Sequence, residues 1–240
     1  MEQTEKHYQN TLDLYFRGAF SVDIVLITYH DKKLKILLQE KKTFPFNGQL
    51  GLPGDLILPN EDIDKALEKL MKSIVGRCDF YNKQLSTFSD LGRHPLGRVV
   101  TFAYYGLVPY DQLEHSLSNE LCWCEISKIP DLIIDHNRIL NNVLKRLRKG
   151  LLRHPVAFYT LSKQFILSEI IGVYEQAFNQ KLDVRNFRKK LLASGLVKRV
   201  GQFRKIEKAA GRPPELYEMN TIKTNTKDRI HFDFLKTDSE

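Results

Sequence analysis

Short apolar runs separated by polar turns dominate the first part of the chain. Phe20–Tyr29 is rich in β-branched and aromatic residues, and Asp23 interrupts its apolar run. Such a run is typical of a buried strand, and Leu34–Gln39 after a polar turn predicts the second strand of a hairpin. Further strands are expected at residues 84–91, Arg98–Val108 and Leu121–Glu125.

Apolar residues at helical spacing predict helices between and before these strands. Ile63, Leu67, Leu70 and Ile74 lie on one stripe of an amphipathic helix from about Asp62 to Val75, which stops at Gly76. Asn60 or Asp62 can cap its N-terminus, because a short side-chain oxygen accepts a free backbone N–H. The remaining helical predictions are residues 5–17, as a short helix or cover segment, and Ile139–Leu147, capped from within 135–137.

The pattern changes from strands to helices after residues 149–155. Gln164–Phe178 is amphipathic, and Asp183 is a candidate N-cap for a second helix, Val184–Ala193, that ends at Gly195. Two short strands, Leu196–Gln202 and Glu215–Met219, follow with residues 204–214 between them. Two helices followed by a hairpin predict a winged helix-turn-helix. The expected division is therefore 1–150, 151–222 and a polar tail at 223–240.

Charge is distributed unevenly along the chain. The formal net charge is +8, and residues 151–240 carry +7 of it. The segment Lys181–Arg212 contains 11 basic residues and two acidic ones. A charged face is most often simply solvated, and a basic helix of a structural domain would look the same. A field of one sign on a folded segment nevertheless favours a polyanionic partner.

The second helix of this pair divides its side chains as DNA-reading helices do. Phe187, Leu191 and Leu192 form an apolar face that can fix the angle of the helix. The opposite face offers cations and an amide for bases and phosphates. Candidate DNA-binding residues in the helix, the following strand and the wing are Arg185, Asn186, Arg188, Lys189, Lys190, Lys198, Arg199, Arg204, Lys205 and Arg212.

Composition points to a globular protein of the cytoplasm. Ile24–Ile27, the longest apolar run near the N-terminus, is far shorter than the roughly 20 residues that span a membrane. The first ten residues are polar, which argues against a signal peptide. Cys78, Cys122 and Cys124 lack the spacing of a zinc site and are expected to be free thiols. No membrane association and no cofactor are expected.

The stretch from Gly51 to Gly76 resembles the Nudix family, whose box reads G-x5-E-x7-R-E-U-x-E-E-x-G-U with U apolar. Aligning Glu61 with the first glutamate of the box places Gly76 at its last glycine. Asp55 then stands at the first glycine, directly after an L-P-G sequence. The resemblance extends over residues 20–145 and implies a Nudix-like α/β/α sandwich with a mixed sheet. With the winged helix, the expected fold class is α+β.

The acidic centre of the box is missing. In the family, R-E-U-x-E-E supplies the carboxylates that hold magnesium, and the matching positions here are Lys69, Leu70, Met71, Lys72, Ser73 and Ile74. Magnesium prefers anionic oxygen ligands, and Glu61 with Glu68 would form at most a partial shell. The sequence therefore predicts no metal, no catalytic residues and no enzymatic activity.

Polar residues nevertheless surround the expected cleft. Buried carboxylates need hydrogen-bond donors, and sugar hydroxyls are good ones. Candidate ligand-binding residues are Asp23, Lys42, Gln49, Asp55 and Glu61. Each also has a structural alternative, such as a bond to neighbouring backbone or a helix cap, and His94 and His136 are expected to be structural. A nucleotide would need more positive charge than Lys41, Lys42, Arg93 and Arg98 supply.

The N-F-R-K-K-L-L helix from Asn186, the G-R-P turn from Gly211 and the L-Y at Leu216 stand behind the Nudix-like region. This arrangement resembles the Nudix-related transcriptional regulators. Some of them respond to ADP-ribose, and a Bacteroides subgroup controls sugar use. The whole chain resembles the arabinose-responsive members of that subgroup most. The resemblance implies a homodimer that represses genes of carbohydrate utilisation from a palindromic double-stranded operator, and that L-arabinose releases.

Two alternatives stay open at this point. A Nudix-type hydrolase of nucleoside diphosphate derivatives such as ADP-ribose, with an altered metal shell, would keep the same frame. An RNA- or protein-binding adaptor would use the same basic segment for a partner other than an operator.

Overall fold

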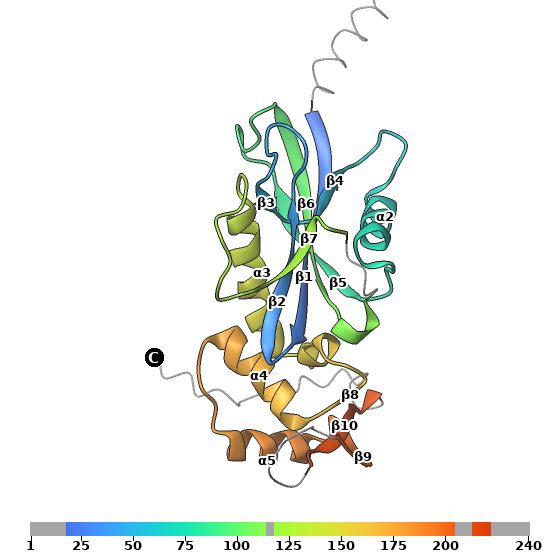
Figure 1. Cartoon of the computed structure of the whole chain (residues 1–240), viewed down its shortest axis with the longest axis vertical. Coiled ribbons are helices and arrows are strands. Elements are labelled where there is room, and N and C mark those ends of the chain that lie inside the picture. The colour runs from blue at the N-terminus through green and yellow to red at the C-terminus, as the bar shows by residue number, and fades with distance from the viewer. Residues whose placement is uncertain (1–17, 114–117, 205–212, 222–240) are drawn as a thin grey trace, which may run out of the picture.

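The computed structural model describes residues 18–113, 118–204 and 213–221 (Figure 1). The predicted segment at residues 5–17, the wing residues Lys205 and Arg212, and the tail at 223–240 lie outside the described residues. Within the described ranges, no helix has both the length and the apolar character that a bilayer span requires.

A mixed seven-stranded sheet forms the N-terminal part of the molecule. Its central order is β3-β2-β1-β6-β5, while β4 pairs with β1 and β7 pairs with β2. The β1–β6 pair is parallel, and the other pairs are antiparallel. The strands are β1 (Gly18–His30), β2 (Lys33–Glu40), β3 (Leu50–Gly51), β4 (Gly54–Leu56), β5 (Tyr81–Phe88), β6 (Arg98–Leu107) and β7 (Leu121–Glu125).

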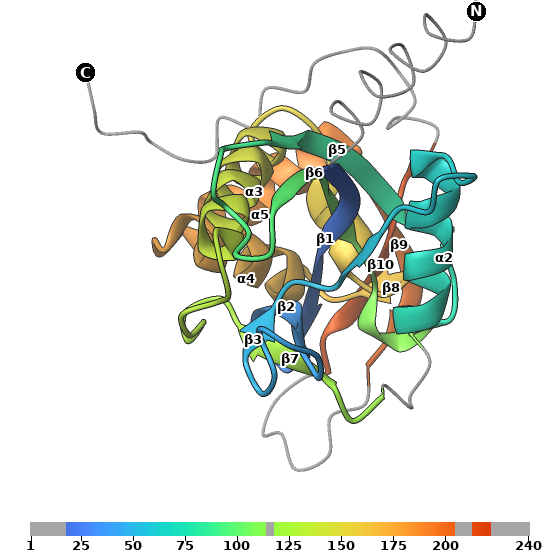
Figure 2. The ribbon, with the colours of Figure 1, turned by 90° about the horizontal axis from the view of Figure 1, so that it is seen from above.

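Helices α2 (Ile63–Val75) and α3 (His136–Leu151) cover opposite faces of this sheet (Figures 1 and 2). Successive side chains of a strand point to opposite faces, so β1 supplies both layers. Ile24 packs in the cluster that contains the apolar stripe of α2, and Val25 packs in the cluster that contains α3. The expected sandwich therefore follows from a strand that is apolar on both faces.

Both ends of α2 follow the expected capping chemistry. The side chain of Asp62 accepts a hydrogen bond from the backbone N–H of Lys65 at 2.8 Å. Gly76 ends the helix with a φ of 77°, a left-handed conformation that glycine adopts without steric cost. A short 3-10 turn at Tyr110–Gln112 follows β6.

The C-terminal part is a small three-stranded sheet with two helices. It begins with a 3-10 turn at Val156–Thr160, and its sheet has the order β8-β10-β9. The elements are β8 (Gln164–Phe165), α4 (Leu167–Phe178), α5 (Val184–Ser194), β9 (Val197–Phe203) and β10 (Glu215–Met219). One cluster of buried side chains continues from α3 into α4 and α5, so the two parts share a core.

Several boundaries differ from the sequence prediction. The helix predicted from Gln164 begins at Leu167, because Phe165 is fully buried and pairs with Tyr217 of β10. Strand β5 ends at Phe88 instead of residue 91. Helix α3 begins three residues earlier than predicted and ends at Leu151, so it crosses the expected boundary at residue 150.

Candidate functional site

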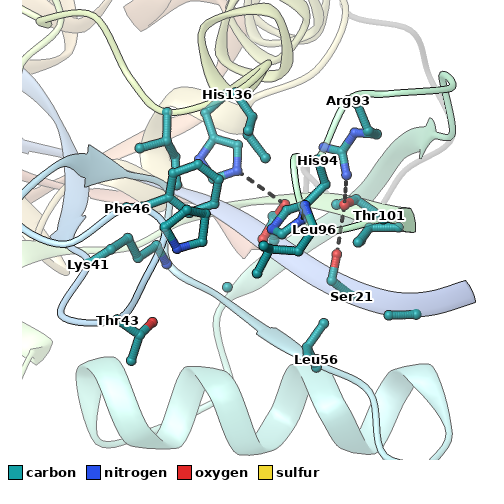
Figure 3. A pocket seen from close by; sticks show the side chains of 18 of the residues that line it. Ser21, Lys41, Thr43, Phe46, Leu56, Arg93, His94, Leu96, Thr101 and His136 are labelled. Carbon is teal, nitrogen blue, oxygen red and sulfur yellow. Dashed lines mark hydrogen bonds and ion pairs between the residues drawn. The ribbon is translucent and has the colours of Figure 1, made fainter.

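A cavity of about 570 Å³ opens at one end of the large sheet. The start of β1, the loop after β2, β4 and the loop between β5 and β6 surround it (Figure 3). Its walls combine carboxylates, cations, hydroxyls and aromatic rings, which are the groups that bind polar organic molecules. The lining includes Ser21, Asp23, Lys41, Phe44, Phe46, Asp55, Arg93, His94, Arg98, Thr101 and His136.

A buried histidine and a buried carboxyl meet in the wall of this cavity. The backbone N–H of Leu52 donates to Nδ1 of His136 at 2.9 Å, so that nitrogen is unprotonated. Nε2 then carries the proton and faces Oδ2 of Asp23 at 3.6 Å. Burial lowers the pKa of His136 to about 3 and raises the pKa of Asp23 to about 6. The cavity therefore contains a neutral imidazole and a carboxyl that titrates near neutral pH.

The glycine of the L-P-G turn is required by this carboxyl. The turn is held on β1 by a bond from the N–H of Ile24 to the carbonyl of Pro53 at 2.9 Å. A Cβ atom on Gly54 would lie 1.8 Å from Oδ1 of Asp23. The L-P-G sequence thus brings backbone directly against Asp23, and any side chain at residue 54 would displace it.

Arg93 stabilises another part of the cavity wall. Its side chain is almost fully buried and makes two hydrogen bonds to the carboxylate of Asp135, at 3.0 and 2.6 Å. A third bond reaches the hydroxyl of Thr101 at 2.5 Å, which in turn lies 2.7 Å from the hydroxyl of Ser21. The charge of Arg93 is therefore satisfied inside the protein, and its role in the wall is to hold the loop between β5 and β6.

Lys41 presents a second cation to the cavity (Figure 3). Its ammonium group donates to Oε1 of Gln39 at 2.8 Å. An ammonium has three donors, so others can serve a ligand. Burial lowers the pKa of Lys41, and the nearby carboxylates Asp23 and Asp55 oppose that shift.

Helix α2 lacks the oxygen ligands of a magnesium site. The ammonium group of Lys69 lies 3.8 Å from a carboxylate oxygen of both Asp55 and Glu61, where it offsets part of their negative charge. Glu68 is paired with Lys72 at 2.5 Å. Across the described ranges, no group of three or more His, Cys, Asp or Glu residues is placed to hold a metal. The residues at this helix do not fit a magnesium ion.

Helix α5 presents a basic face to solvent at the far end of the molecule (Figure 1). Asp183 caps it by accepting from the N–H of Asn186 at 3.1 Å, and Phe187 and Leu191 are buried. Arg185, Arg188 and Lys189 are exposed, and none makes an ion pair with the described residues. Leu192, which the sequence assigned to the buried face, is 37% exposed, since the inward stripe consists of Phe187 and Leu191.

The cations of β9 are more constrained than those of α5. Lys198 is paired with Glu218 at 3.2 Å, and Arg199 with Glu215 at 3.6 Å, while both side chains stay largely exposed. Arg204 bonds to Glu169 at 2.5 Å and to the carbonyl of Gln164 at 3.1 Å. Arg204 therefore joins the end of β9 to the start of α4, which is a structural role.

Comparison with known proteins relates both parts of the chain to transcriptional regulators. Residues 157–219 match the family described as the NrtR DNA-binding winged helix domain. The crystal structure of Shewanella oneidensis NrtR complexed with a 27mer DNA superposes with a TM-score of 0.75 at 27% identity, covering 85% of this chain and 95% of that one. The chain joins a Nudix-like domain to an NrtR-type winged-helix domain. The predicted α+β fold with its winged helix is thereby confirmed.

Of two curated relatives, one is named as a repressor and the other as an enzyme. The ADPR responsive transcriptional repressor NtrR of Acinetobacter baylyi is 27% identical over 211 residues, which are 85% of this chain and 82% of that protein. An ADP-ribose pyrophosphatase of Methanocaldococcus jannaschii is 26% identical over 133 residues, which are 55% of this chain and 76% of the enzyme. The match to the repressor therefore spans most of this chain, whereas the match to the enzyme covers only about half of it.

In the Nudix-like domain, two of the five predicted ligand residues line the cavity. These are Asp23 and Asp55, whereas Lys42, Gln49 and Glu61 are not among the lining residues. Lys42 forms an ion pair with Glu40 at 2.6 Å. Glu61 accepts from the N–H of Leu58 at 3.3 Å, in addition to its contact with Lys69. The backbone carbonyl of Gln49 accepts a hydrogen bond from the N–H of Lys41 at 2.9 Å.

Lys41, Arg93, Thr101 and His136 also line the cavity, although the sequence did not name them as ligand-binding residues. It named Lys41 and Arg93 only as nearby cations and expected His136 to be structural. Thr101 could have been found, because a parallel strand beside β1 places it opposite Ser21, two residues before Asp23. Lys41 and Lys42 are neighbours in the loop after β2, so the sequence does not indicate which of them faces the cavity. The fold places Lys41 there. The hydrogen bond from the N–H of Leu52 to His136 joins residues 84 positions apart, so no local sequence pattern indicates it.

In the winged-helix domain, the proposed DNA contacts stay predictions. Arg185, Asn186, Arg188, Lys189 and Lys190 all belong to α5, and their positions are exposed on the helix. Lys205 and Arg212 lie outside the described residues.

Proposed function

We propose that this protein is a cytoplasmic transcriptional repressor that binds operator DNA through α5 and a small effector in the cavity of its Nudix-like domain. One observation supports the proposal above others. The NrtR-type winged helix carries Arg185, Arg188 and Lys189 on α5, and none of the three makes an ion pair with the described residues. It is joined to a Nudix-like domain that has Leu70, Ser73 and Ile74 at the three glutamate positions of the box helix. The cavity then serves for binding and not for hydrolysis.

The proposed effector is ADP-ribose or a closely related nucleotide sugar. The curated relative matched over most of the chain is named as ADPR responsive. The cavity volume of about 570 Å³ falls in the range of about 300–1,000 Å³ that is typical for drug-sized ligands, and a free pentose is much smaller. Phe44 and Phe46 offer ring faces, and Lys41 offers ammonium donors for phosphate.

L-Arabinose, the effector implied by the sequence resemblance, has no support from the relatives. It remains a candidate because Asp23 and Asp55 can accept hydrogen bonds from sugar hydroxyls. A response limited to carbohydrate-utilisation genes would follow from L-arabinose and not from ADP-ribose. The two effectors are therefore separated by direct binding measurements.

Operator binding by a homodimer is part of the proposal. Dimers of helix-turn-helix proteins read two half-sites about one helical turn apart, so a palindromic operator is expected. An effector that changes the angle between the two winged-helix domains would move their α5 helices out of register with the half-sites. The outcome is release of DNA when the effector binds.

A thermal-shift screen against ADP-ribose, L-arabinose and other monosaccharides tests the effector site, because a ligand that binds only the folded state raises the Tm. We expect ADP-ribose to raise the Tm with or without magnesium. Footprinting on the promoters beside the protein's own gene tests the operator. Protection of a palindrome supports the proposal, and preferential binding to RNA or to a protein partner contradicts it.

Hydrolysis of nucleoside diphosphates is the second candidate function, and the match to an ADP-ribose pyrophosphatase is what favours it. Magnesium-dependent release of ribose phosphate from ADP-ribose, abolished by Glu61→Ala, would establish it. The contacts of Glu61 with Lys69 and with the backbone of Leu58 argue against a metal at this carboxylate. We therefore expect no turnover above that of a protein-free control.

A further inference from the structure

Helix α3 begins in the wall of the effector cavity. Asp135, its N-cap residue, does not cap the helix with its side chain and instead holds Arg93 through two hydrogen bonds. The next residue, His136, accepts from the N–H of Leu52 and faces Asp23. The N-cap residue and the first residue of α3 thus fix the L-P-G turn and the loop between β5 and β6, which are two walls of the same cavity.

The other end of α3 is bonded to α4, the first helix of the winged-helix domain. Nε of Arg148 donates to the carbonyl of Ala177 at 2.5 Å. The hydroxyl of Tyr174 donates to the carbonyl of Leu151 at 3.0 Å, and Tyr174 itself is buried. These two bonds satisfy carbonyls near the C-termini of both helices, which would otherwise lack a helical partner.

Between its ends, α3 packs along the sheet. Its 16 residues correspond to about 24 Å at 1.5 Å per residue. Ile139, Val143 and Leu147 form a stripe that is almost fully buried against the sheet. A helix packed at interior density resists bending, so a shift at one end is carried to the other. Figure 1 shows the helix reaching from the level of β3 down to α4.

Helix α4 is also bonded to the Nudix-like domain at a place that does not involve α3. The side-chain amide of Gln176 accepts from the N–H of Leu34 at 2.7 Å and donates to the carbonyl of Lys32 at 2.6 Å. This pair of bonds joins α4 to the turn between β1 and β2, and neither Lys32 nor Leu34 lines the effector cavity. It provides a matched comparison for the bonds made by α3.

We propose that α3 couples the effector cavity to the winged-helix domain, and that Arg148 and Tyr174 are the positioning residues through which it moves α4. The proposal rests on the proposed function for the identity of the signal. An effector that displaces Arg93 or the L-P-G turn shifts the first turn of α3, and the last turn shifts α4 with it. Because α4 packs on α5 through Tyr174 and Phe187, whose ring centroids are 5.2 Å apart, the DNA-reading helix follows.

The test measures the coupling factor, which is the ratio of operator affinities without and with saturating ADP-ribose. Allosteric factors are typically about 5–150-fold, and we expect wild type to lie in that range. The double variant Arg148→Met, Tyr174→Phe should lower the factor to below about twofold, while ADP-ribose still raises the Tm as in wild type. The control Gln176→Ala removes the α3-independent attachment and should keep the wild-type factor. A normal factor in the double variant, or an equal loss in both variants, overturns the proposal.

A second measurement needs no effector, so failure of the proposed ligand and failure of the coupling are distinguishable. Asp135→Asn weakens the bonds of Arg93 at the cavity end of α3. Backbone hydrogen exchange should then become faster in α3 and in α4, whereas α2 on the other face of the sheet keeps its wild-type exchange. Unchanged exchange in α4, or an equal increase in all three helices, contradicts the proposal. An absent Tm shift with ADP-ribose in wild type contradicts the effector alone.

Discussion

Nε2 of His136 lies 3.6 Å from Oδ2 of Asp23, and burial moves the pKa values of the two side chains in opposite directions. Neither group is more than 7% exposed. The imidazole stays neutral because burial lowers its pKa, and its Nδ1 accepts a hydrogen bond from the backbone N–H of Leu52. The result is a carboxyl whose charge depends on pH beside a histidine whose charge does not change in the neutral range.

The opposite pKa shifts predict a specific dependence of stability on pH. The pKa of Asp23 is raised from 3.8 to about 6, so its contribution to stability is present below pH 4 and is lost as pH rises through about 6. The pKa of His136 is lowered from 6.5 to about 3, so its contribution is present above pH 6.5 and is lost as pH falls toward 3. In wild type the two trends partly cancel between these limits.

Asp23→Asn should remove the first trend and leave the second. As pH rises from 4 to 7, the free energy of unfolding of the variant should increase relative to that of wild type by on the order of 1–3 kcal/mol. Urea unfolding at several pH values measures this difference. Asp55→Asn is the control, because it removes a carboxylate from an exposed position of the same cavity wall. A difference for Asp23→Asn that does not change with pH would show that the carboxyl is not desolvated as described.

Neighbouring lysines offer a direct test of which side chain binds the effector. Lys41→Met should weaken ADP-ribose binding by about tenfold or more, because it removes a charge-assisted donor from the cavity. Operator affinity in the absence of effector should stay within about twofold of wild type. Isothermal titration and DNA-binding anisotropy measure the two quantities.

The matched control for this prediction is Lys42→Met. Lys42 is outside the cavity lining and paired with Glu40, so its replacement should leave ADP-ribose affinity unchanged. If Lys42→Met weakens ADP-ribose binding and Lys41→Met does not, the prediction of Lys42 as a ligand residue is right and the cavity is not the effector site.

Arg185 lies in the first turn of α5, the part of a recognition helix that contacts base edges. Arg185→Ala should lower affinity for the operator by about 1–3 kcal/mol with no loss of thermal stability. Lys65→Ala, which removes an exposed cation from α2, should have no such effect. Equal losses from both variants would indicate that net charge alone attracts the DNA.

The sequence predicted those elements whose signals are local. The stripe from Ile63 to Ile74 with a cap at Asp62 gave α2, and Asp183 and Gly195 gave both ends of α5. Local spacing failed at Phe165, which fits the apolar period of a helix but is held in a strand by its pairing with Tyr217. Tertiary pairing therefore overrode periodicity at the start of α4.

The candidate site could be predicted only in part, for the same physical reason. Asp23 interrupts an apolar strand and Asp55 follows the L-P-G turn, so both stand out in the sequence. Arg93 and Asp135 gain their roles from each other across 42 positions, and neither has a distinguishing neighbour. The choice between Lys41 and Lys42 depends on which one the loop after β2 turns toward the cavity.

The most direct test of the account is a titration of ADP-ribose against the full-length protein bound to a fluorescent operator fragment. Anisotropy reports release of the DNA, and chromatography of the same sample reports any cleavage of the nucleotide. We expect the complex to dissociate as ADP-ribose is added, with or without magnesium, and the ADP-ribose to be recovered intact. A complex unaffected by ADP-ribose, or nucleotide cleaved in a magnesium-dependent manner, would contradict it.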